Sequence, residues 1–151
     1  MPAFVSIDIL IIVGIFVLFI LSSLKLGKSF LACFIIAFYP SYLIFTNLTN
    51  INGKDVLLKA GIFVGIFIFT YIVCGRIVAT SFSFLKMTRF IQMALLSSAC
   101  TSLVIFFHYH VVSLAQYHDF GASVDTLFTT TVPLIGWLAF PIVALFISSR
   151  D

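Results

Sequence analysis

Near its start the chain carries an uncharged, almost wholly apolar run, Ile9-Leu-Ile-Ile-Val-Gly-Ile-Phe-Val-Leu-Phe-Ile-Leu-Ser-Ser-Leu24, which ends just before Lys25. A helix needs about 20 mainly apolar residues to cross the hydrocarbon core of a bilayer. The run is longer than most signal-peptide cores, no basic segment precedes it, and no small-residue cleavage site follows it. It therefore predicts an uncleaved transmembrane helix over about residues 5–24.

The composition of the whole chain has the same character. Of its 151 residues, 62% are hydrophobic and 9% are charged, whereas soluble domains carry about 25% charged residues. Five crossings would use about 100 residues, so we expect residues 1–151 to form a single transmembrane domain, with no cofactor. The cations stand at the ends of apolar runs rather than on one exposed face, which argues against nucleic acid as a partner.

Four more apolar segments follow the first. They predict helices over about residues 29–46, 58–80, 91–112 and 127–148. Pro40 predicts a kink in the second helix, and Pro133 and Pro141 make the last segment irregular. The mixed segment 81–90 has the pattern of an amphipathic helix at the membrane interface. We predict an all-α, polytopic bundle of five transmembrane helices; four crossings plus a re-entrant or interfacial C-terminal segment is the alternative.

The distribution of cations predicts the orientation, because lysine and arginine gather in cytoplasmic loops. In the five-helix arrangement one side of the membrane carries Lys25, Lys28, Arg76, Lys86, Arg89 and Arg150. The other side carries only Lys54 and Lys59, together with Asp119 and Asp125. We therefore expect the N terminus to lie outside and the C terminus in the cytoplasm.

Small residues form two stripes with helical spacing. Gly61 and Gly65 have the small-xxx-small spacing that lets two helices approach closely in lipid. Ala94, Ser98 and Ser102 repeat every four residues on the fourth segment and could pack and hydrogen-bond across a helix pair. Packing inside one monomer and homo-oligomerisation through the same faces are both open.

Asp8 is the acidic residue at the start of the first apolar run. A carboxylate inside a membrane is a functional candidate, and here it could serve a proton or cation relay. Counting the helical rise back from Lys25 places Asp8 about 25 Å away, near the outer interface. A solvated helix end is therefore the simpler expectation.

Histidines and carboxylates gather around the end of the fourth segment. His108, His110, His118 and Asp119 are of the types that hold zinc or another divalent ion. Yet His108 and His110 are two residues apart, which points them to opposite sides of a helix, whereas helical metal pairs have spacings of three or four. Interfacial histidines beside tyrosines also belong to the amphipathic belt of membrane proteins. These residues are weak candidates for a metal site.

Three hypotheses for function follow. The chain lacks a recognisable catalytic motif, so the first is a non-enzymatic subunit or scaffold of a membrane assembly, whose partners are the lipid bilayer and other membrane subunits or further copies of itself. The second is a small oligomeric transporter or channel, because interrupted helices often line substrate paths. The third is an intramembrane metal-dependent enzyme that uses the histidines.

The order of these elements is similar to that of the colicin V production protein family. The matching pieces are Asp8-Ile-Leu-Ile-Ile, Lys25-Leu-Gly-Lys28, a third helix with Gly61, Gly65 and Gly75, and the stretch from Phe82 to Met93. They cover about residues 8–112; the arginine-glycine pair usual in the first turn is absent, and residues 113–151 add a fifth run. The resemblance implies a bacterial inner-membrane protein with an accessory role in export or envelope physiology.

Overall fold

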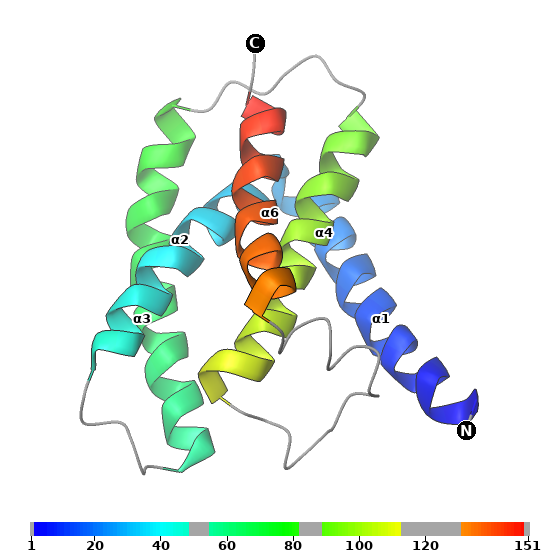
Figure 1. Cartoon of the computed structure of the whole chain (residues 1–151). Helices are drawn as coiled ribbons and strands as arrows, with labels where there is room; N and C mark the ends of the chain where they lie inside the picture. Colours follow the sequence, from blue (N-terminus) through cyan, green and yellow to red (C-terminus); the bar gives the residue numbers. More distant parts are fainter. Residues whose placement is uncertain (1, 49–54, 82–88, 113–130, 150–151) are drawn as a thin grey trace.

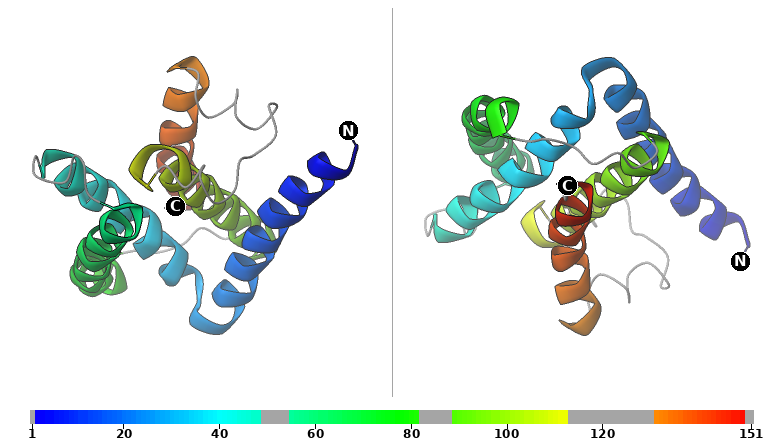
Figure 2. Two further views of the ribbon diagram at one scale, coloured as in Figure 1. Left: turned by 90° about the horizontal axis from the view of Figure 1, so that it is seen from below. Right: turned by 90° about the horizontal axis from the view of Figure 1, so that it is seen from above.

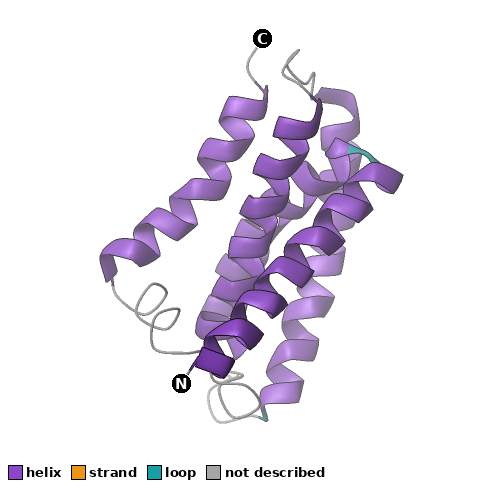
Figure 3. Ribbon diagram, turned by 90° about the vertical axis from the view of Figure 1, so that its right-hand side faces the viewer, coloured by secondary structure: helices purple, strands orange, loops and turns teal. Residues whose placement is uncertain are grey.

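All the elements that the structure describes are helices. The computed structural model describes residues 2–48, 55–81, 89–112 and 131–149. The helices are α1 (Pro2–Leu26), α2 (Lys28–Asn47), α3 (Val56–Ser81), α4 (Arg89–Phe107), its π-helical continuation η2 (His108–Val112), and α6 (Thr131–Ser149) (Figure 1). Within these ranges no strand is present (Figure 3). The predicted all-α bundle is confirmed.

Four helices are long and apolar enough to cross a membrane. Their spanning segments are Asp8–Leu26, Lys28–Asn47, Val56–Arg76 and Phe90–His110. In α6 the apolar segment Ile135–Ser148 is shorter, so five crossings and four crossings plus a C-terminal segment both agree with the structure. Residues 82–88, most of the expected interfacial segment, lie outside the described residues.

A single glycine joins the first two helices. Gly27 has φ 87° and ψ 168°, a backbone conformation that is essentially restricted to glycine. Its N–H donates to the carbonyl of Ser23 at 2.9 Å, which closes the last turn of α1. Because α2 begins at Lys28, the chain reverses direction within one residue.

The helix α4 lies at the centre of the bundle. It packs against α1, α2 and α6, while α3 packs mainly against α2. Views along the bundle show α4 between α6 and α1, and the first half of α1 diverging from the other helices (Figure 2). Accordingly, the α4 residues Leu96 and Leu103 are fully buried, whereas Leu10 of α1 is 72% exposed and Phe69 of α3 is 68% exposed. The outer faces of α1 and α3 have the apolar character that lipid requires.

Aromatic side chains set the register between α2 and α3. Three ring pairs, each one helical turn from the next, join the two helices: Phe30 with Tyr71, Phe34 with Phe67, and Phe38 with Phe63. Their centroids are 6.0, 4.9 and 5.7 Å apart. From one pair to the next, the residue number rises by four on α2 and falls by four on α3. The two helices are therefore antiparallel and stay in contact at three successive turns.

Candidate functional site

A buried polar contact lies beside Pro40 of α2, in the middle of the bundle. Pro40 has no N–H to bond to the Ile36 carbonyl, and the next carbonyl, that of Ala37, faces two hydroxyl groups. It accepts a hydrogen bond from Ser41 Oγ at 2.6 Å, and Thr70 Oγ1 of α3 lies 3.4 Å from it. The two hydroxyl oxygens are 2.5 Å apart. Both side chains are buried, so this small network joins α2 to α3.

A hydroxyl group also bonds to the backbone near Pro141 of α6. Leu138 lies in the turn before Pro141, and its carbonyl accepts a hydrogen bond from Tyr39 Oη of α2 at 2.6 Å. A bond of this kind gives the tyrosine hydroxyl a partner inside the bundle. Residues 39–41 of α2 therefore connect that helix both to α3 and to α6.

Sequence reasoning noted Pro40 and Pro141 but not the hydroxyl groups that serve them. The available signal was the position of Tyr39 and Ser41 on either side of Pro40 in an otherwise apolar run. Nothing in the sequence indicated that Thr70 would lie opposite Ala37, because that depends on the α2–α3 register.

A second polar contact joins the first turns of α2 and α4. Lys28 Nζ donates to Gln92 Oε1, and Gln92 is fully buried. A hydrogen bond to a charged group is worth more than one between neutral groups, about 1.5–3 kcal/mol. This contact fixes the end of the bundle where α1 turns into α2, and the sequence analysis did not single out Gln92.

The glycine stripe of α3 faces away from the bundle. Gly61 and Gly65 are exposed, and a Cβ added at either position would meet nothing within 4 Å. Of the two alternatives that the sequence left open, packing of these glycines within the monomer is not what the described residues show. The reason is that α3 turns its aromatic side, which includes Phe63 and Phe67, towards α2.

The stripe on α4 lies inside the bundle but does not bond across it. Ser102 is buried, and Ala94 and Ser98 are half-buried. The hydroxyl of Ser98 donates to the Leu95 carbonyl at 2.8 Å, and that of Ser102 donates to the Ala99 carbonyl at 2.7 Å. Both bonds stay within α4, so among the described residues Ser98 and Ser102 do not make the hydrogen bonds across a helix pair that the sequence allowed.

The Asp8 carboxylate is not at a solvated helix end. The side chain is 4% exposed, so the expectation of a hydrated carboxylate is wrong. Asp8 lies in α1 at the first residue of its spanning segment. The protein itself therefore covers this carboxylate, which lies at the end of the span rather than in its middle.

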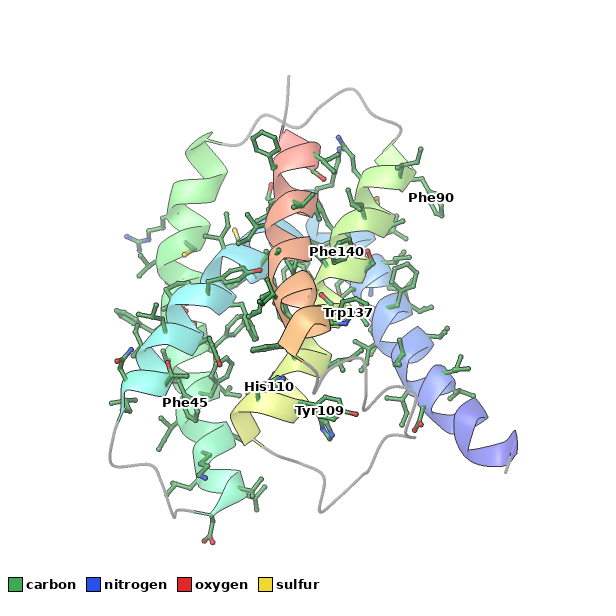
Figure 4. All side chains as sticks on the ribbon, in the orientation of Figure 1. Phe45, Phe90, Tyr109, His110, Trp137 and Phe140 are labelled. Carbon is green, nitrogen blue, oxygen red and sulfur yellow. The ribbon has the colours of Figure 1, made fainter. Side chains whose placement is uncertain are left out.

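The two described histidines lie at the end of α4, where the helix widens into η2 (Figure 4). The His110 ring lies 4.6 Å from that of Phe106, and the His108 ring lies 5.2 Å from that of Tyr109. Each imidazole therefore packs on a different aromatic ring. His118 and Asp119 lie outside the described residues. Within the described part of the chain, no group of three metal-ligating side chains is present.

The geometry thus offers three features: hydroxyl groups bonded near two helix prolines, a buried carboxylate, and an outward-facing glycine stripe. Comparisons of the chain with protein-family models, curated proteins and solved structures find no match.

Proposed function

We propose that this protein is a non-enzymatic subunit or scaffold of a membrane assembly, and that it associates with another transmembrane helix through the outer face of α3. The observation that carries the proposal is the exposure of Gly61 and Gly65. Glycine at this spacing allows two helix backbones to come into close contact within lipid. Inside the monomer these two glycines make no such contact.

The rest of that face is suited to helix packing. Leu58, Ile68 and Ile72 lie on the same stripe as the glycines, with a spacing of three and four residues, and are 48%, 53% and 57% exposed. This is the spacing with which the contact residues of one helix meet a second helix. The stripe would place apolar side chains on both sides of the glycine contact.

The double substitution Gly61→Leu and Gly65→Leu tests this proposal. Both side chains would project outward, so the monomer should keep its helix content and the close helix contact should be lost. Native mass spectrometry of protein extracted gently from its own membrane reports the stoichiometry and any foreign subunit. We expect the parent protein to appear as a complex, either of identical copies or with another membrane protein, and the variant as a monomer.

The matched control is Gly14→Leu on α1, where the glycine is also exposed and a Cβ also meets nothing. It should leave the complex intact. A double variant with the same stoichiometry as the parent protein would contradict the proposal, and so would equal loss of the complex in the Gly14 control.

A small oligomeric transporter or channel is the second candidate. The prolines inside α2 and α6 favour it, because prolines are common in the helices that form the substrate sites of transporters. It ranks second because both helices continue through their prolines and the hydroxyl groups near them already bond to backbone carbonyls. Proteoliposomes that show no flux of ions or small solutes above protein-free vesicles would exclude it.

We further propose the bacterial inner membrane as the location, with the N terminus outside, and an accessory role in export or envelope physiology. The cation bias of the loops supports the orientation. The first turn of α1 and the last turn of α6 lie at opposite ends of the bundle, which agrees with it (Figure 1). A reporter fused at Lys86 should be found in the cytoplasm; an external reporter would reverse the orientation.

A further inference from the structure

An aromatic groove lies between α2, α3 and α4. It encloses about 260 Å³ and is lined by apolar side chains only. Its walls are formed by Phe34, Phe38, Phe63, Phe67 and Phe107. Val104 completes the wall on α4, and Val64 lies at the rim on α3, where it is 46% exposed. All these residues lie within membrane-spanning segments, so the groove opens where lipid chains surround the protein.

The size and chemistry of the groove suit a hydrocarbon. An apolar cavity of about 150 Å³ in a protein core remains dry and binds benzene, and this groove is larger. Its aromatic walls lose dispersion contacts if the space stays empty. Lipid tails are as apolar as the side chains of the core, so a chain that enters the groove gains packing without any cost of desolvation.

A cation lies in line with the groove. Lys59 precedes Phe63 by one helical turn and Phe67 by two, so the three residues share a stripe of α3. The rise of four residues places the Lys59 backbone about 6 Å beyond that of Phe63, towards the N-terminal end of α3. Lysine side chains near helix ends extend towards the headgroup region. Among the described residues Lys59 makes no ion pair, and its side chain is partly exposed.

We propose that the aromatic groove holds one acyl chain of an anionic phospholipid, whose phosphate is bound by Lys59. A hydrocarbon chain alone would explain the apolar walls but would leave the cation without a role. A lipid with a negative headgroup would place its acyl chain in the groove and its phosphate beside Lys59, one helical turn beyond Phe63. The proposal is independent of helix association through Gly61 and Gly65, because the groove lies on the side of α3 that faces α2 and α4.

The test compares lipid retention by the full-length protein and by two variants. Each is reconstituted in nanodiscs containing equal amounts of dioleoyl phosphatidylglycerol and dioleoyl phosphatidylcholine, transferred to a mild detergent, and analysed by native mass spectrometry. We expect the parent protein to retain one phosphatidylglycerol in preference to phosphatidylcholine.

The variants separate the two parts of the site. Val104→Phe fills the groove and should abolish retention of either lipid. Lys59→Gln leaves the groove intact and should reduce the preference for phosphatidylglycerol by about fivefold, the effect of one basic residue on an anionic lipid. The controls are Ile72→Phe on the exposed face of α3, where Ile72 is 57% exposed, and Lys25→Gln on the exposed end of α1. Both should behave like the parent protein.

Several results would overturn the proposal. They are retention by Val104→Phe equal to that of the parent, no preference for phosphatidylglycerol in the parent, and equal loss of preference in the Lys25 and Lys59 variants. If Val104→Phe fails to fold, as circular dichroism would show, the Lys59 substitution at the surface decides the outcome. Because neither variant alters Gly61 or Gly65, a change in lipid retention is distinguishable from a change in oligomeric state.

Discussion

Two hydroxyl groups, those of Thr70 and Tyr39, contact a turn that contains a proline in a neighbouring helix. The Tyr39 hydroxyl donates to the Leu138 carbonyl of α6. The Thr70 hydroxyl lies 2.5 Å from Ser41 Oγ of α2, and because the Ser41 proton is donated to the Ala37 carbonyl, Thr70 is the donor in this pair. Polar groups need protein partners in hydrocarbon, because water is absent there, and these two hydroxyl groups join the helices in meeting that need.

Thr70→Val should destabilise the protein by about 1 kcal/mol, within the range measured for hydrogen bonds between membrane helices. The substitution keeps the shape of the side chain and removes the hydroxyl group that bonds to Ser41 of α2. The matched control is Thr101→Val, since the Thr101 hydroxyl bonds at 2.8 Å to the Ser97 carbonyl of its own helix. Unfolding in mixed micelles with increasing denaturing detergent measures both. Equal losses in the free energy of unfolding would show that the contact of Thr70 with α2 stabilises the protein no more than a hydrogen bond within one helix does.

At the scale of the element, the α1–α2 connection depends on the conformation of one residue. Gly27 combines φ 87° with ψ 168°, which a residue with a Cβ adopts only under strain. No neighbouring atom lies within 4 Å of a Cβ built at this position, so the requirement for glycine comes from the backbone itself rather than from crowding.

Gly27→Ala should therefore reduce stability by about 1–3 kcal/mol. Gly14→Ala, in the middle of α1, should be neutral or slightly stabilising, because alanine has the higher helix propensity and the position is open. The same detergent titration compares the two variants. A Gly27 variant as stable as the parent protein would show that the turn can adopt another conformation.

At the scale of the whole molecule, burial is concentrated on α4 and is small on α1. In the most apolar stretch of 18 residues, 61% of the α4 residues are buried inside the protein, compared with 6% of those in α1. The central helix holds the others together, whereas α1 contacts mainly α4 and presents most of its surface to lipid. Packing defects should therefore have very different effects in the two helices.

Leu103→Ala should cost about 2 kcal/mol, and Leu18→Ala should cost close to nothing. Leu103 is fully buried in α4, and Leu18 is 64% exposed on α1. We expect the lower end of the range for buried leucines, because lipid is as apolar as the core and only packing is lost. The free energy of unfolding in mixed micelles checks this comparison, and similar losses at both positions would contradict the central place of α4.

The number of helices and their approximate ranges could be predicted from the sequence, because length and apolar composition determine which segments suit a bilayer. The structure places Pro40 and Pro141 inside helices that continue on both sides. The hydroxyl groups that lie near these prolines could not be predicted, because they depend on how the helices are aligned.

The face that each helix turns inward was decided only by the tertiary structure. In a soluble helix the apolar stripe identifies the buried side, but these helices are apolar all round, and lipid solvates apolar side chains as well as the core does. The sequence could therefore show that Gly61 and Gly65 share a face and that Asp8 lies at the start of the first apolar run. Whether that face meets lipid, and whether that carboxylate is buried, depended on how side chains such as Phe63 and Phe67 pack against α2.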